Sequence, residues 1–320
     1  MVANVFKAIF ITSCMGTLLS LILFLIKPVT KKVFSAGWNY YVWLIVLVVM
    51  ILPVKIPIQQ NGAEQIHIVN EKSAYTVNTD TSKSEYNEIA EVPDIADTVT
   101  YADVEEIKPS AYETIKDFLI EKTDVIAYIW LIGVVVMLVL KISGYVMFLI
   151  KVRKNSEVIH CSEITQYTKR KVVTRVCGFI SSPLMTGIIK PTLLLPEAQL
   201  TDEQMYNVFS HEMTHLKRND ILYKWFLNIV KCIHWFNPVI YLVGNTINKE
   251  CEISCDIAVV DNMSKEEVVA YVDTIIALIT SKTARINSLT TEMTGEKKTL
   301  KERFEMIKSR RKISKKTVVI

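Results

Sequence analysis

Three long apolar runs are the main feature in the pattern of hydrophobic and polar residues along this chain. The runs cover residues 5–26, 38–54 and 125–150. Inside them the only charged residues are Lys7 and Lys141. A helix that crosses a bilayer needs about 20 predominantly apolar residues. We therefore expect three transmembrane helices: two in 1–54, joined by a short cytoplasmic loop, and a third at 124–150. The first run lacks the proportions of a cleaved signal, so we expect it to be retained.

The region after the third run changes from β-type to helical patterning. β-branched residues cluster from 172 to 196, and extended segments are predicted at 178–181 and 192–195. Thr201, followed three residues later by Gln204, fits a capping box, and the apolar positions that follow recur mostly at intervals of three and four. The pattern predicts a small sheet and then a helix that starts after Thr201.

Two more helical stretches follow. Residues 221–243 are strongly apolar, but two lysines, His234 and Pro238 interrupt them. This favours a pair of core or membrane-associated helices, broken before Pro238, over a further span. We expect His234 to be a core or helix-end residue and not a catalytic group. Residues 245–260 are also predicted to be helical.

Composition and charge indicate that the polar parts of the chain lie on two different sides of a membrane. The mean hydropathy is +0.28 while 22% of the residues are charged, which excludes both a fully soluble and a fully membrane-embedded chain. Residues 55–123 contain 6 Lys/Arg against 14 Asp/Glu, and residues 151–320 contain 26 against 18. Basic residues follow the first and third runs and mark the cytoplasmic side. We expect 55–123 to be an acidic, flexible extracellular loop and 151–320 to be cytoplasmic.

The helix that begins after Thr201 carries His211-Glu212-Met213-Thr214-His215. Residues four apart share one face of a helix, so two imidazoles can bind one zinc ion while Glu212 projects beside them. The ion lowers the pKa of a bound water, whose proton the carboxylate accepts and later passes to a leaving amine. The pattern predicts a zinc-dependent peptidase with His211 and His215 as ligands and Glu212 as general base.

The third ligand has to come from farther along the chain. A catalytic zinc ion takes three protein ligands, and no histidine stands six residues after His215. Within the predicted helix 245–260, Glu252 and Asp256 share one face. Glu252 is the candidate ligand, and Asp256 could orient a ligating imidazole through its free N–H. The alternative interpretation of this pair is a solvated acidic face.

Two cysteines in the same helix leave a different metal site open. Cys251 and Cys255 are also four residues apart, and with the two histidines they could form a closed, structural zinc site. Such a site would leave Glu212 without a bound water to activate. The intact carboxylate at 212 therefore favours the catalytic arrangement.

These motifs together resemble the membrane-bound zinc metallopeptidases of the β-lactam sensor-transducer type, an antirepressor family of bacterial antibiotic-resistance regulation. The matching stretches are Ser182-Pro183 with Gly187 and Pro191, Leu195-Pro196-Glu197, His211 to His215, Leu216-Lys217-Arg218-Asn219-Asp220, His234-Trp235-Phe236-Asn237-Pro238, and Glu252-Ile253-Ser254-Cys255-Asp256. They span about 75 residues of the predicted cytoplasmic region. The resemblance implies a membrane α-helical part followed by an α+β, zincin-like metallopeptidase domain, mostly helical with a small sheet.

The resemblance also implies a cofactor and a set of site residues. One Zn²⁺ is expected. The implied residues are the zinc ligands His211, His215 and Glu252, the general base Glu212, and Asp220 and Asp256 as candidates for supporting the ligands. The implied activity is a regulatory endopeptidase of the bacterial cell membrane that cleaves itself or a cytoplasmic repressor. The alternatives are a housekeeping membrane protease and a non-catalytic transducer with structural zinc.

The expected partners are the lipid bilayer and a protein substrate, which we expect to dock as an added strand at a sheet edge near 192–195. The tail 297–316 contains 10 Lys/Arg against 2 Glu, which favours the anionic inner leaflet over direct nucleic-acid binding. A homodimer is left open. β-Lactam-sensing relatives have a fourth span and an extracellular penicillin-binding domain. The chain ends at Ile320, and Ser309 to Lys312 has the SxxK form without SDN or KTG after it, so the resemblance does not by itself imply a β-lactam receptor role.

Overall fold

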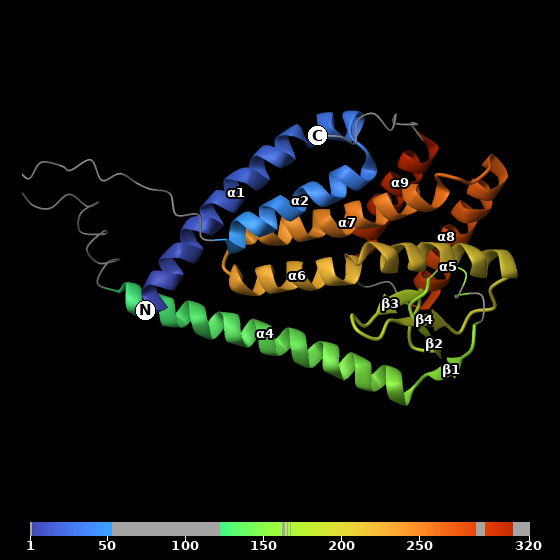
Figure 1. The fold of residues 1–320 in the computed structure, drawn as a ribbon, viewed down its shortest axis with the longest axis horizontal. Helices are drawn as coiled ribbons and strands as arrows, with labels where there is room; N and C mark the ends of the chain where they lie inside the picture. The colour runs from blue at the N-terminus through green and yellow to red at the C-terminus, as the bar shows by residue number, and fades with distance from the viewer. Residues whose placement is uncertain are drawn as a thin grey trace, which may run out of the picture. The chain divides into compact units, whose positions relative to one another are not determined.

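The computed structural model describes residues 2–52, 122–161, 164, 166, 168–285 and 292–309. The helices are α1 (Val2–Val33), α2 (Ala36–Ile51), α4 (Thr123–Lys154), α5 (Asp202–Arg218), α6 (Asp220–Ile233), α7 (Pro238–Val260), α8 (Lys265–Arg285) and α9 (Glu292–Lys308) (Figure 1). The strands are β1 (Glu157–Ile159), β2 (Val173–Cys177), β3 (Leu184–Thr186) and β4 (Thr192–Pro196). The acidic loop predicted at 55–123 lies outside the described residues, apart from its last two positions.

All three apolar runs are helical, but they differ in length. Helices α1 and α4 have 32 residues each and are long and apolar enough to cross a membrane. Many of their large apolar side chains are exposed, for example Leu25 at 80% and Met147 at 69%. Helix α2 has 16 residues, fewer than the roughly 20 of a typical span. The length criterion therefore identifies two candidate spans among the described residues, where the sequence predicted three.

The apolar stretch 221–243 folds into a helical hairpin, as the sequence predicts. Helix α6 ends at Ile233, and α7 begins with Pro238 in its first turn, where a missing N–H costs little. Asn237 caps α7, because its side-chain oxygen accepts a hydrogen bond from Val239 N at 2.9 Å. His234 is fully buried and donates from Nε2 to the Met50 carbonyl oxygen at 3.1 Å, which confirms its assignment to the core.

The tip of the hairpin packs against α1, α2 and α4. The contacts with α2 and α4 lie at the ends of these helices that are far from the predicted cytoplasmic side. The amide nitrogen of Asn237 donates to Ser13 Oγ and Thr17 Oγ1 of α1, both at 2.8 Å. Trp130 Nε1 of α4 donates to the Ile233 carbonyl oxygen at 2.9 Å. These bonds satisfy polar groups of the tip in surroundings that are otherwise apolar. They therefore fix the position of the tip along α1 and α4.

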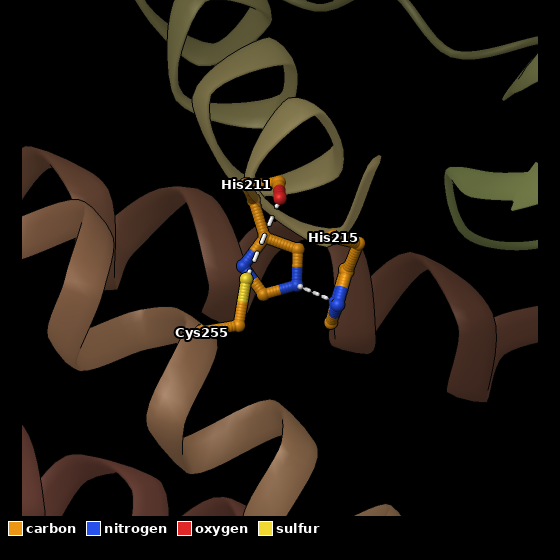
Figure 2. A group of neighbouring side chains, drawn as sticks. All are labelled: His211, His215 and Cys255. Carbon is orange, nitrogen blue, oxygen red and sulfur yellow. Dashed lines mark hydrogen bonds between the residues drawn. The ribbon is translucent and has the colours of Figure 1, made fainter. Parts of the chain in front are cut away.

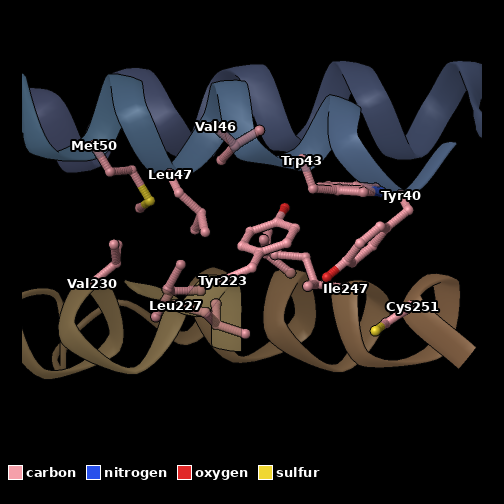
Figure 3. Close-up of a cluster of buried hydrophobic side chains, with 12 residues drawn as sticks. Tyr40, Trp43, Val46, Leu47, Met50, Tyr223, Leu227, Val230, Ile247 and Cys251 are labelled. Atoms are coloured by element: carbon pink, nitrogen blue, oxygen red, sulfur yellow. The ribbon is translucent and has the colours of Figure 1, made fainter. Parts of the chain in front are cut away.

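One face of α2 and the α6–α7 hairpin share a hydrophobic core (Figure 3). From α2 it contains Tyr40, Trp43, Val46, Leu47 and Met50, and from the hairpin Tyr223, Leu227, Val230, Ile240, Val243, Ile247 and Cys251. Burying one side chain of Leu or Met size stabilises a fold by about 1.5–3 kcal/mol. The direction of α6 along α2 is fixed at both ends: His234 meets Met50, and Asp220 Oδ1 accepts a bond from Tyr40 Oη at 3.1 Å. The start of α6 therefore lies at the N-terminal end of α2.

The four strands form one sheet in the order β1-β2-β4-β3, in which β2 and β4 are parallel and the outer pairs are antiparallel. The strand predicted at 192–195 is confirmed as β4. The one predicted at 178–181 is wrong, because this segment is a turn and the strands lie on either side of it at β2 and β3. Gly178 and Pro183 favour turns, whereas the β-branched residues of 173–176 fit the ladder.

Strand β4 lies inside the sheet, which changes the expected docking edge. It pairs with β2 on one side and with β3 on the other, so no free backbone edge exists at 192–195. The outer strands of the sheet are β1 and β3. Of these two, β3 contacts α5, the helix that carries the histidines.

Helix α5 begins and is held as the sequence predicts. Thr201 Oγ1 accepts from Gln204 N at 3.2 Å, and Gln204 Oε1 accepts from Thr201 N at 3.1 Å, which completes the capping box. Its apolar face packs on β4 through Val208, Phe209, Met213 and Leu216. The helix ends at Asn219, whose φ of 55° is a left-handed conformation that Asn tolerates better than most residues. The turn at Asn219 starts α6 immediately.

Helices α8 and α9 pack against the C-terminal half of α7. The shared cluster contains Val260, Tyr271, Ile275 and Ile307, with Phe304 and Leu300 against it. This packing brings residues from three distant parts of the chain to the same end of α5.

Candidate metal centre

Helices α5 and α7 bring the three predicted ligands together. His211 and His215 project from one face of α5, and Glu252 faces them from α7. The two Nε2 atoms lie 3.2 Å apart. Glu252 Oε2 lies 3.5 Å from His211 Nε2, and Glu252 Oε1 lies 3.8 Å from His215 Nε2. Two imidazole nitrogens and the two oxygens of one carboxylate therefore face one another between the helices.

These separations fit a zinc ion. Bonds of about 2.0–2.2 Å at tetrahedral angles place neighbouring donor atoms roughly 3.3–3.5 Å apart. The observed 3.2–3.8 Å, in which each histidine faces a different oxygen of Glu252, is close to that range. Two imidazoles and one carboxylate are also a donor set that zinc accepts in catalytic sites, where the fourth position remains open.

Asp220 orients His215. Its Oδ2 accepts from His215 Nδ1 at 2.7 Å, and both side chains are almost fully buried. A proton held on Nδ1 leaves the lone pair on Nε2, which points toward Glu252 and His211. Asp220 begins α6 directly after the left-handed turn at Asn219, so the end of α5 and the start of α6 build this contact together.

His211 is oriented through two residues. Its Nδ1 lies 2.8 Å from Tyr271 Oη, and that hydroxyl donates to Asp256 Oδ1 at 2.8 Å. Asp256 Oδ1 also lies 3.4 Å from His211 Nδ1. Arg303 of α9 donates to both oxygens of Asp256, from Nε at 2.6 Å and from Nη2 at 2.8 Å. Asp256 thus lies beside a histidine, as the sequence predicts, but a tyrosine carries the shorter contact.

The two cysteines also lie near the histidines, in a different arrangement. Cys251 Sγ lies 3.8 Å from His215 Nδ1 and donates to Asp220 Oδ2 at 3.5 Å. It is therefore on the side of the ring that faces away from Glu252. Cys255 Sγ donates to the His211 carbonyl oxygen at 3.4 Å (Figure 2). The ligand atoms of His211, His215 and Cys255 also lie within 4.8 Å of one another.

The electrostatics of the cluster favour a cation between its donor atoms. Burial acts to raise the pKa of the Glu252 carboxyl, but the hydrogen bond to His211 and the charges of His215 and Lys224 hold it well below its usual range. Burial acts to lower the pKa of His215, whereas the bond to Asp220 raises it, and the net pKa is well above normal. The pKa of His211 is raised in the same sense, against burial, by Cys255 and Tyr271. Positive charge is stabilised on these rings, and a divalent ion would supply it.

Glu212 occupies the position between the two histidines in α5 and is 7% exposed. Lys224 of α6 lies near this part of the site, with Nζ 3.7 Å from Glu252 Oε1. Burial acts to lower the pKa of Lys224, but the charge of Glu252, with smaller contributions that include Glu212, raises it above normal. Lys224 therefore keeps its positive charge next to Glu252.

A cavity of about 460 Å³ opens beside His215. Its walls are the segment before β2, the turn between β3 and β4, the end of α5 and the start of α6. Among its lining residues the charged ones are Arg170, Lys171 and Lys190, and the apolar ones include Ile188 and Leu222. The cavity is large enough for part of a peptide, and its charges favour an acidic one.

Three residues near the predicted ligands were missed by sequence reasoning: Lys224, Tyr271 and Arg303. None forms a recognisable spacing with the histidines, because each comes from a different helix and its contact depends on how the helices pack. Tyr271 is 60 residues away from His211 in the sequence, so no local motif links the two residues.

Comparisons with known proteins agree with the motifs. The model of the family described as BlaR1 peptidase M56 matches residues 7–307. The regulatory protein BlaR1 of Bacillus licheniformis is 30% identical over 55% of this chain and 31% of its own length. The methicillin resistance mecR1 protein of Staphylococcus aureus is 25% identical over 46% of this chain and 26% of its own length. The regulatory protein BlaR1 of Staphylococcus aureus is 24% identical over 90% of this chain and 48% of its own length. The chain spans less than half the length of each relative.

Proposed function

Because this chain belongs to the BlaR1 peptidase M56 family, we propose that it is a membrane-embedded, zinc-dependent endopeptidase that works as a regulatory signal transducer. The observation that carries the proposal is the convergence of His211 Nε2, His215 Nε2 and the Glu252 carboxylate within 3.2–3.8 Å. In this proposal His211, His215 and Glu252 hold one zinc ion. The relatives are named as regulatory and methicillin-resistance proteins, which supports regulation over housekeeping proteolysis.

The roles of the protein groups follow from their positions. A zinc ion held by His211, His215 and Glu252 would supply Lewis acidity and would lower the pKa of a water bound to it. Glu212 accepts a proton and returns it to the leaving amine, a role suited to a carboxylate that ligates nothing. Asp220 keeps the proton of His215 on Nδ1, and Asp256 acts on His211 through Tyr271. The hydrogen bond to His211 and the charges of His215 and Lys224 keep Glu252 ionised.

We infer that the substrate is a peptide segment of this protein itself or of a cytoplasmic repressor. The outer edge of β3, a strand that contacts α5, can accept such a segment as an added strand. A side chain of this segment can enter the cavity beside His215, where Arg170, Lys171 and Lys190 favour acidic residues. The second candidate, a structural site formed with Cys251 and Cys255, is less well supported because Cys251 lies on the Nδ1 side of His215.

The proposed topology places residues 55–123 outside and the metal centre inside the cell. Asp220, which orients His215, bonds to Tyr40 at the N-terminal end of α2, where the basic residues Lys31 and Lys32 precede it. The centre would therefore lie at the inner boundary of the bilayer. A cytoplasmic substrate would meet it at the membrane surface.

An impermeant thiol reagent tests this topology on intact cells that express a variant without native cysteines. A cysteine placed at Ser82, outside the described residues, is expected to be modified. One placed at Lys265, exposed at the start of α8, is expected to be spared until the membrane is permeabilised. The reverse pattern would overturn both the topology and a cytoplasmic site.

Metal removal tests the activity itself. Purified full-length protein is expected to contain one zinc ion and to cleave itself or a co-expressed repressor. A strong chelator should stop cleavage, and added zinc should restore it, because the ligands come from packed helices that remain folded. Cleavage that continues at the same rate after complete removal of zinc would rule out the proposed chemistry.

A further inference from the structure

An unbroken series of hydrogen bonds runs from α9 to the imidazole of His211. Arg303 donates two bonds to Asp256, Tyr271 donates one to the same carboxylate, and Tyr271 Oη lies 2.8 Å from His211 Nδ1. Asp256 is 1% exposed on its side chain and Arg303 13%, so solvent does not compete for these bonds. Four residues from α5, α7, α8 and α9 are joined at one place.

The direction of each bond follows from the chemistry of Arg303. A guanidinium is always protonated, and it cannot accept a hydrogen bond. Facing it, Asp256 is an ionised acceptor at both oxygens. The hydroxyl proton of Tyr271 is therefore directed to Asp256, and the free lone pairs of the tyrosine oxygen face His211. The His211 proton stays on Nδ1, and Nε2 keeps its lone pair toward His215 and Glu252.

A network of ion pairs holds α9, the helix that carries Arg303, against α7 and α1. Glu302, the neighbour of Arg303, lies 2.9 Å from Lys249 Nζ of α7 and 3.3 Å from Lys31 Nζ at the end of α1. Lys31 and Lys27 also pair with the buried Glu250, at 3.4 and 3.0 Å. On the other side of α9, Phe304 and Ile307 pack in the cluster around Tyr271. Helix α9 is thus held on two sides, which fixes the position of the Arg303 guanidinium relative to Asp256.

We propose that Arg303 is a positioning residue of the metal centre: from α9 it holds the Asp256–Tyr271 pair so that His211 presents Nε2 to the zinc ion. This inference rests on the proposed function, because it concerns how one ligand of that site is oriented. It extends the site to α8 and α9, which carry no predicted ligand.

The zinc dissociation constant of the full-length protein, measured by competition with a chelator of known affinity, tests this role. Arg303→Gln is expected to weaken zinc binding about 10- to 100-fold, the usual effect of losing an outer hydrogen-bond partner. Arg303→Lys retains the charge but not the two-pronged geometry, and should recover part of the affinity. Lys301→Gln is the matched control, because Lys301 is exposed on the same helix and pairs with Glu305, one turn away. It should bind zinc like the wild type.

A second variant separates positioning from stability. Arg303→Gln leaves the buried Asp256 carboxylate without its cation, which also destabilises the fold. The double variant Arg303→Gln, Asp256→Asn removes that charge, so its melting temperature should return toward the wild-type value. Zinc affinity should stay low, because a neutral amide is a weaker acceptor for the Tyr271 hydroxyl.

The outcomes are distinguishable. If Arg303→Gln is folded and binds zinc with wild-type affinity, or if the double variant recovers stability and affinity together, Arg303 is only a structural residue and the inference is wrong. If the wild type itself binds no zinc, the proposed function fails and this inference fails with it. Wild-type zinc binding with a folded, weakly binding Arg303→Gln supports both.

Discussion

Glu212→Gln is expected to lower the rate of peptide cleavage about 10²- to 10⁴-fold, the usual contribution of a general base. The substitution keeps the size and polarity of the side chain but removes the group that accepts a proton. Glu212 is 7% exposed and follows His211 directly in α5, and the proposed chemistry requires a proton acceptor beside a zinc-bound water. Self-cleavage of the full-length protein, or cleavage of a co-expressed repressor, measures the effect on denaturing gels.

Zinc content and membrane insertion should remain at the wild-type level in Glu212→Gln, since Glu212 is not one of the proposed ligands. Glu203→Gln is the matched control: it removes a carboxylate from the same helix, at an exposed position in the first turn. Its cleavage rate should be unchanged. If wild-type protein cleaves no supplied substrate and Glu212→Gln signals normally in cells, the non-catalytic transducer replaces the peptidase.

Glu252→Ala is expected to remove most of the bound zinc from the purified protein. The carboxylate supplies donor atoms 3.5 and 3.8 Å from the two Nε2 atoms, and without it two protein ligands remain. The loss of affinity should exceed the 10- to 100-fold that removal of an outer hydrogen-bond partner typically costs. Metal analysis after dialysis against zinc-free buffer measures the remaining stoichiometry.

The cysteines provide the contrasting variant. Cys251→Ala together with Cys255→Ala should retain stoichiometric zinc, because Cys251 Sγ faces the Nδ1 side of His215 and Cys255 Sγ donates to a backbone carbonyl. Both residues are fully buried, so their removal can lower the melting temperature without affecting the metal. Zinc that persists in Glu252→Ala but is lost from the double cysteine variant would move the site to the cysteines and make it structural.

Local signals in the sequence were sufficient wherever one segment determines its own structure. The capping box at Thr201 and Gln204 fixes the start of α5 because both hydrogen bonds lie within the first turn. Pro238 separates α6 from α7 because proline removes a donor that a continuous helix needs. The spacing of His211 and His215 follows from the helical repeat alone. The chain's membership of its family could likewise be inferred from short motifs.

Pairing between strands was not determined locally, and there the sequence-based expectations were wrong. The segment 178–181 forms a turn, and the segment 192–195 lies inside the sheet and not at its edge. A short apolar run carries no information about which strands will flank it. The sheet also packs on α5 through residues far apart in the chain, which no local pattern specifies.

The sequence by itself determined which residue types could hold a metal ion and which helix faces carry them. Only the tertiary structure decided that Glu252, and not Cys251, faces both Nε2 atoms, because the rotation and depth of α7 against α5 set that choice. The structure also placed Tyr271 between His211 and Asp256 and brought Arg303 from α9 to the same carboxylate. Helix periodicity specifies the direction of a side chain on its own helix. Its partner across an interface is specified by packing that many distant residues determine together.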